Sequence, residues 1–210
     1  MKKPGKTVIT VAAAVVAIIT AGLIVSAYFG SFEGKDNTVI PAENVIEISE
    51  DFIPPAEQGQ GDNIYKKQIS IVNSSNAPCY VRVYMDFSDS QIRNRSYLSN
   101  DPNAAADSFY KADRSTSGDT YIANLSTLAP GWVFIPDDAA APLAGYYYYT
   151  NPVAAGGTTS PLITFVKTVN TNAEEIQQYD IIVYSESIQT TNTSGDPYTD
   201  YNDAWTTALS

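Results

Sequence analysis

The chain contains no histidine and only one cysteine, Cys79. Without imidazole it cannot form a Ser-His-Asp triad, a Cys-His pair or an H-E-x-x-H zinc site. A single thiol permits neither an intrachain disulfide nor a cysteine-ligated zinc or iron–sulfur centre. A lone cysteine in a secreted protein is expected to be buried as a small apolar side chain, with an intermolecular disulfide as the alternative.

Positive charge is also scarce. The chain has 12 lysines and arginines against 23 acidic residues, which gives a formal net charge of −11. Such a surface repels phosphate backbones, so we exclude nucleic acid as a partner. Two carboxylates at the right spacing could hydrolyse a glycoside, but the acids are scattered over predicted loops and the sequence identifies no such pair. We therefore predict no enzymatic activity and no catalytic residue.

Only one long apolar run occurs, from Val8 to Val25, and three lysines precede it. It ends in Ser26 and Ala27, small residues at the spacing that a signal peptidase recognises. We predict a signal peptide over residues 1–27, cleavage between Ala27 and Tyr28, and a product that is secreted to the cell surface or extracellular matrix.

The same run is long enough to cross a bilayer, so an uncleaved N-terminal membrane anchor is the alternative. In both cases contact with the membrane is confined to residues 8–25. A type IV prepilin is disfavoured, because its hydrophobic run normally carries a glutamate near the start and this one has none.

The remainder of the chain divides into an arm and a domain. Residues 28–44 are interrupted by Gly30, Gly34 and Pro41, which predicts an extended arm outside the core. Residues 45–210 carry the alternating apolar pattern of half-buried strands, and turn residues separate these strands. Strands are predicted at residues 45–48, 65–73, 79–87, 132–135, 146–149, 162–169 and 179–189.

Between these strands we predict turns at residues 59–63, 73–76 and 156–157, and a short helical or turn segment at 174–178. Residues 88–128 are polar and predict loops with a short helix, and residues 203–209 predict a terminal helical turn. Seven strands without a long helix indicate an all-β fold. We predict a single antiparallel β-sandwich, jelly-roll or Ig-like, with an N-terminal signal helix and an extended arm.

Three features allow a ligand or a covalent link. The four tyrosines of 146–149 place two rings on each face of a strand, which predicts core packing or, alternatively, an aromatic platform for a ligand. Lys66 or Lys67 with an asparagine could form an isopeptide bond. No metal or other cofactor is predicted; calcium at a cluster of aspartates is the weak candidate, against a solvated acidic loop. These aspartates are Asp196, Asp200 and Asp203.

The order of motifs along the chain resembles that of the biofilm matrix proteins exported with a SipW-type signal peptidase. This is the TasA/camelysin group, and the resemblance is strongest to its pilin-like BsaA branch. It covers nearly the whole chain and is carried by Ser26–Phe29, Lys66-Lys67, Asn73, Ala77–Val83, Gly131-Trp132, Tyr146–Tyr149, Ser160–Leu162, Tyr179–Gln189 and Ala204-Trp205.

The resemblance implies export from a Gram-positive cell and a structural role in biofilm matrix or pilus-like fibres. In fibre-forming relatives the mature N-terminal arm adds a strand to a neighbouring subunit. The partners would then be further copies of this chain or related matrix subunits, besides the signal peptidase. The arm side chains expected to fill the neighbour's groove are Phe29, Phe32, Val39 and Ile40.

A metallopeptidase activity, which some members of this group are said to have, conflicts with the absence of histidine. The alternative function is a monomeric, adhesin-like surface module that binds glycan or protein and is held by an N-terminal membrane anchor. Fibre formation that depends on residues 28–44 distinguishes the structural subunit from this module.

Overall fold

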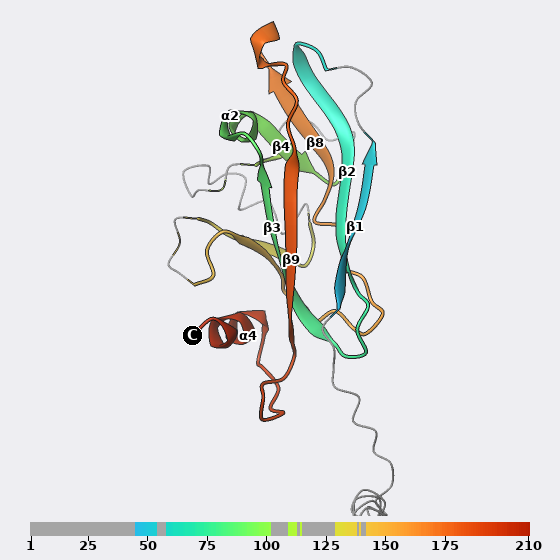
Figure 1. The fold of residues 1–210 in the computed structure, drawn as a ribbon, viewed down its shortest axis with the longest axis vertical. Coiled ribbons are helices and arrows are strands. Elements are labelled where there is room, and N and C mark those ends of the chain that lie inside the picture. The colour runs from blue at the N-terminus through green and yellow to red at the C-terminus, as the bar shows by residue number, and fades with distance from the viewer. Residues whose placement is uncertain are drawn as a thin grey trace, which may run out of the picture. The chain divides into compact units, whose positions relative to one another are not determined.

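The computed structural model describes residues 45–53, 58–101, 109–112, 114, 129–137, 139 and 142–210, all within the compact unit Ala42–Ser210. These residues form two antiparallel sheets, as the alternating patterns predict (Figure 1). The five-stranded sheet has the order β1 (Ile46–Ile53), β2 (Gly61–Asn73), β8 (Ile163–Asn170), β4 (Ser96–Ser99) and β5 (Tyr110–Lys111). The four-stranded sheet has the order β6 (Trp132–Ile135), β7 (Tyr146–Tyr149), β3 (Cys79–Phe87) and β9 (Ile181–Gln189).

The core lies between the two sheets. Ile69 and Ile71 of β2 and Val81 and Val83 of β3 are fully buried there, and Trp132 of β6 packs with them. Because side chains alternate along a strand, every second residue of β3 faces this core. The all-β class and the two-sheet arrangement predicted from the sequence are therefore confirmed.

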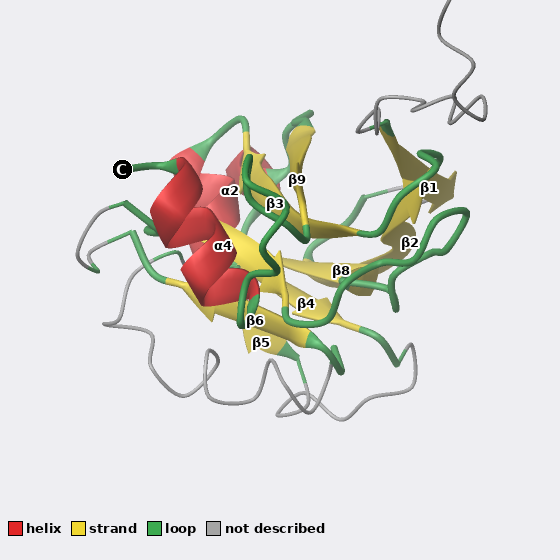
Figure 2. Cartoon of the chain, turned by 90° about the horizontal axis from the view of Figure 1, so that it is seen from below, coloured by secondary structure: helices red, strands yellow, loops and turns green. Residues whose placement is uncertain are grey.

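Helix α4 (Tyr201–Ala208) covers part of the outer face of the four-stranded sheet (Figure 2). Its Trp205 is buried against Tyr148, and the guanidinium of Arg82 lies 4.4 Å from the Trp205 ring. Arg82 and Tyr80 are consequently buried although they face away from the core. The prediction of a half-buried strand at 79–87 was wrong for its first half, because a helix covers the second face.

Two local predictions need correction. Strand β2 begins at Gly61 rather than at Tyr65, because residues 61–63 pair with Asn170, Val169 and Thr168 of β8. The segment 88–128, predicted as loops with a short helix, contains a short helix, α2 (Ser90–Asn94), but also the strands β4 and β5, which were not predicted. The short helical or turn segment predicted at residues 174–178 is present slightly earlier, as the 3-10 turn η3 (Ala173–Glu175).

Cys79 is fully buried on the core face of β3, as expected for a small apolar side chain. Burial raises the pKa of its thiol from 9.0 to about 11. Because the folded-state pKa is the higher one, the thiol's contribution to stability is complete below pH 9 and declines as the pH rises towards 11.

We expect Cys79 to resist a thiol reagent such as dithionitrobenzoate at pH 8 in the folded protein and to react at once in urea. The measurement is the absorbance of the released thiolate. Rapid reaction of the folded protein, or a disulfide-linked dimer on a non-reducing gel, would contradict the buried position.

Candidate functional site: an open groove between two edge strands

One side of the sandwich is incomplete. Strand β1 is the edge of the five-stranded sheet and β9 is the edge of the four-stranded sheet, and the two strands lie next to each other. They are eight and nine residues long, whereas β5 and β6, at the opposite edges, have two and four residues. An edge strand leaves half of its backbone N–H and C=O groups without a ladder partner. The long free edges are therefore on the β1/β9 side.

The inner face of β1 is only partly covered by the opposite sheet. Ile48 pairs with Ile71 of β2 and Phe52 pairs with Lys67, so both point to the core side of their sheet. Ile71 is fully buried, but Ile48 is 36% exposed and Phe52 is 48% exposed. Both side chains are therefore partly open to solvent, although β9 of the other sheet lies next to β1.

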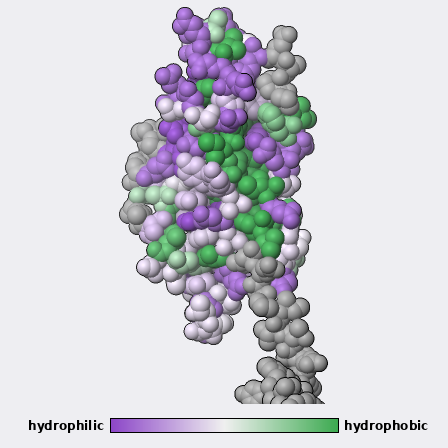
Figure 3. Space-filling model, viewed as in Figure 1, coloured by the Kyte–Doolittle hydropathy of each residue, from purple (hydrophilic) through white to green (hydrophobic). Residues whose placement is uncertain are grey.

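Strand β9 supplies the second wall. Its Ile181 and Val183 are partly buried and pack against the core, because they face inward from a free edge. We call the channel bounded by Ile46, Ile48 and Phe52 of β1 and by Ile181 and Val183 of β9 the β1–β9 groove. Figure 3 shows apolar side chains gathered along this side of the molecule, over β9 and towards β1.

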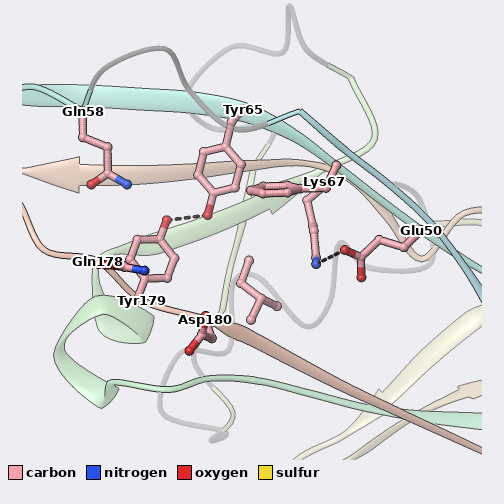
Figure 4. Close-up of a pocket in the computed structure, with 9 residues that line it drawn as sticks. Glu50, Gln58, Tyr65, Lys67, Gln178, Tyr179 and Asp180 are labelled. Atoms are coloured by element: carbon pink, nitrogen blue, oxygen red, sulfur yellow. Dashed lines mark hydrogen bonds and ion pairs between the residues drawn. The ribbon is translucent and has the colours of Figure 1, made fainter.

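The groove deepens into a cavity of about 310 Å³ at its Phe52 end. The segment that leads into β9 forms one side of the cavity, and the middle of β2 and the end of β1 form the other (Figure 4). The rings of Phe52 and Tyr65 meet edge to face, with centroids 6.0 Å apart. The lining residues are Glu50, Phe52, Gln58, Tyr65, Lys67, Gln178, Tyr179, Asp180 and Ile181.

Four of the polar groups around this cavity form two pairs. The Lys67 ammonium contacts Glu50 Oε1 at 2.5 Å and lies 5.2 Å from the centroid of the Phe52 ring. The hydroxyls of Tyr65 and Tyr179 hydrogen-bond to each other, as Figure 4 shows. Burial and the neighbouring Tyr179 raise the pKa of Tyr65, which keeps this phenol neutral. The rings of Phe52 and Tyr65 and the side chain of Ile181 offer apolar contact in this cavity, and its polar lining offers hydrogen bonds, so it suits an amphipathic aromatic or apolar segment.

The two lysines considered for an isopeptide bond have carboxylate partners. Lys66 forms an ion pair with Asp51, and Lys67 forms one with Glu50, both across the β1–β2 pair. Within the described residues, neither amine has an asparagine among its polar contacts. These contacts stabilise the β1–β2 pair without a covalent link.

Several predicted site residues lie outside the described part of the chain. These are the cleavage-site residues Ala27 and Tyr28 and the arm residues Phe29, Phe32, Val39 and Ile40. The apolar run at residues 8–25 lies outside it as well, and among the described residues no helix is long and apolar enough to cross a bilayer.

The three aspartates proposed for calcium are described, and two of them cap helix α4. The Asp200 carboxylate accepts a hydrogen bond from the Asp203 N–H at 2.8 Å, and the Asp203 carboxylate accepts one from the Thr199 N–H at 3.0 Å. Reciprocal bonds of this kind satisfy the free N–H groups at a helix N-terminus. Asp196 lies in the preceding turn, and the described residues contain no group of three acidic, histidine or cysteine residues able to hold a metal ion.

The groove itself was not predicted from the sequence. The alternation of Ile46, Ile48 and Phe52 indicates a strand with an apolar face, but it does not indicate that this face lacks a cover. No known protein-family profile matches the chain, and a search of curated proteins finds no significant match. The resemblance to the TasA/camelysin group therefore stays a prediction.

Proposed function

We propose that this chain is a secreted structural subunit of extracellular biofilm matrix or pilus-like fibres, and that it assembles by strand addition at the β1–β9 groove. The observation that carries the proposal is the exposed, inward-facing apolar surface of β1 beside the free edge of β9. An added strand would hydrogen-bond to an edge and cover Ile48 and Phe52. This proposal includes a jelly-roll or Ig-like sandwich and export through an N-terminal signal helix.

The occupant that we propose is the segment 28–44 of a second copy. It has 17 residues and reaches about 56 Å when extended, while the nine residues of β9 need about 30 Å. Its Phe29 and Phe32 match the aromatic-lined cavity at the Phe52 end, and Val39 and Ile40 match the aliphatic walls. Since each subunit carries one arm and one groove, head-to-tail addition does not close and gives filaments.

The test compares residues 28–210 with residues 45–210 by electron microscopy and sedimentation. We expect fibres from the first protein and monomers from the second, because only the first has the donor segment. A synthetic peptide of residues 28–44 should then bind residues 45–210 and raise the melting temperature. A matched peptide with serine at positions 29, 32, 39 and 40 should not.

Two outcomes would reject this function. Monomers from both proteins, together with a higher melting temperature for residues 28–210, would mean that the arm fills the groove of its own chain. Monomers of equal stability, with no binding of the peptide, would mean that the arm does not enter the groove. Either result would favour the second candidate, a monomeric adhesin-like module with an N-terminal anchor, for which an exposed aromatic surface on the outer face of β9 provides a specific argument.

A further inference from the structure

Three tyrosines form a row across the outer face of the four-stranded sheet. Tyr84 of β3 pairs with Tyr184 of β9. On the other side, the β3–β7 register sets Arg82 opposite Tyr148 and Val83 opposite Tyr147, which places Tyr146 beside Tyr84. The ring centroid of Tyr84 lies 5.8 Å from that of Tyr146 and 6.3 Å from that of Tyr184. We call Tyr146, Tyr84 and Tyr184 the tyrosine row.

This row lies beside the part of the sheet that helix α4 covers. The helix packs its Trp205 and Tyr201 on Tyr148, in the neighbouring row of outward-facing side chains. Tyr184 is 63% exposed, the largest fraction among the exposed large apolar and aromatic side chains of the described residues. The tyrosine row, with Ser185 and Glu186, lines a shallow hollow in the surface.

The charges next to the row are neutralised within the protein. The Arg82 guanidinium lies 4.0 Å from the centroid of the Tyr146 ring and donates to Glu186 Oε2 at 2.6 Å. The Arg114 guanidinium lies 4.3 Å from the Tyr84 centroid and pairs with Asp137 at 2.9 Å. Each cation therefore has a carboxylate partner, and the hollow offers no net charge to an ionic ligand.

The hollow also offers hydrogen-bond donors and acceptors that have no partner among the described contacts. Among the described contacts, the hydroxyls of Tyr146 and Tyr184 have no partner, and Arg82 occupies only one of the two oxygens of Glu186. A ligand that matches this surface needs apolar faces for the rings, acceptors or donors for the phenols, and a donor for the carboxylate. Sugar units have C–H faces that stack on aromatic rings and hydroxyls that both donate and accept.

We propose that the tyrosine row binds a neutral polysaccharide chain, with Tyr184 as the principal stacking ring. A proline-rich segment fits less well, because proline has no N–H to donate to Glu186. An anionic polymer fits less well because the chain is acidic and the local arginines are paired. The inference does not depend on fibre formation, since the row faces away from the β1–β9 groove.

The test is affinity electrophoresis of the full chain, kept soluble in mild detergent, through gels that contain dextran, laminarin, galactomannan or hydroxyethyl cellulose. Polygalacturonate serves as the anionic comparison. We expect at least one neutral polymer to retard the protein. Tyr184→Ala should weaken that retardation about tenfold and Tyr184→Phe about twofold, because the ring is lost only in the first. Unchanged urea midpoints of both variants would show that the fold is intact.

A groove variant separates this proposal from the previous one. Phe52→Ala changes an exposed aromatic side chain of the β1–β9 groove, so it should leave polysaccharide binding unchanged while it weakens assembly. The proposal is overturned if no neutral polymer retards the protein or if Tyr184→Ala binds as tightly as the wild type. Retardation by polygalacturonate alone would overturn it too, as would a Tyr184→Ala defect confined to self-association or to the binding of a polyproline peptide.

Discussion

Assembly is expected to weaken about a hundredfold or more when Ile48 is replaced by lysine. Ile48 points into the β1–β9 groove and is 36% exposed, so an added strand would bury it. Covering the part of Ile48 that is still exposed contributes roughly 1 kcal/mol, and burying an unpaired ammonium in its place costs about 2 kcal/mol or more. A loss of about 3 kcal/mol is a factor of about a hundred in the association constant.

The folded monomer should tolerate this change, because the lysine ammonium can reach water from the open groove. Ser49→Lys is the matched control: it adds the same charge at the next residue of β1, on the opposite and exposed face. The measurement is the lowest protein concentration at which residues 28–210 form sedimentable fibres. Equal assembly by Ile48→Lys and the wild type, or equal defects in the two variants, would reject the groove as the assembly site.

The largest loss of stability is expected for Arg114→Met, about 3–5 kcal/mol in the free energy of unfolding. Arg114 is 4% exposed, and its guanidinium donates hydrogen bonds to the carbonyls of Met85 and Gly145 and to both carboxylate oxygens of Asp137. Methionine fills a similar volume but leaves the two buried carbonyls without a donor, and a buried polar group without a partner is costly.

Arg93→Met is the comparison, because Arg93 also pairs with a carboxylate, that of Asp86, but is more exposed. The Arg93 side chain is 25% exposed and, among the described contacts, donates only to the Asp86 carboxylate, so its loss leaves no carbonyl without a donor and is expected to cost about 1 kcal/mol. Urea unfolding followed by circular dichroism measures both variants. If Arg114→Met were no less stable than Arg93→Met, the buried guanidinium would not be the link between β3 and the β6–β7 connection.

The strands predicted best from the sequence are those with a strong apolar or aromatic pattern of their own. Cys79–Phe87 alternates over nine residues, and the aromatic-rich strands Trp132–Ile135 and Tyr146–Tyr149, both predicted, pair with each other. Strand β4 escaped prediction because Ser96–Ser99 has only two apolar or aromatic residues, Tyr97 and Leu98, in a polar segment, and its extended form depends on pairing with Phe165–Thr168 of β8. Such a strand is determined by a distant partner rather than by local propensity.

The candidate sites also divide into features that follow from local sequence and features that depend on distant segments. The capping role of Asp200 and Asp203 could have been predicted, because two acids three residues apart before an apolar residue are typical of a helix start. The β1–β9 groove could not, because it depends on which strand ends each sheet, and strand order is not encoded in any one segment. The tyrosine row could not be predicted either, because it depends on the register between β7, β3 and β9. Only Tyr146 of this row belongs to the four tyrosines considered as an aromatic platform.

The two tryptophans lie in different layers of the molecule and can therefore report on them separately by fluorescence. Trp132 is buried between the sheets and donates a hydrogen bond to the carbonyl of Ser160 at 2.9 Å. Trp205 belongs to helix α4 and packs next to the guanidinium of Arg82, on the outer face of the four-stranded sheet. In the Trp132→Phe variant the remaining Trp205 reports whether helix α4 is docked on the sheet. In the Trp205→Phe variant the remaining Trp132 reports whether the core between the sheets is packed. A lag between the two emission changes on unfolding would show that the helix detaches before the sandwich opens.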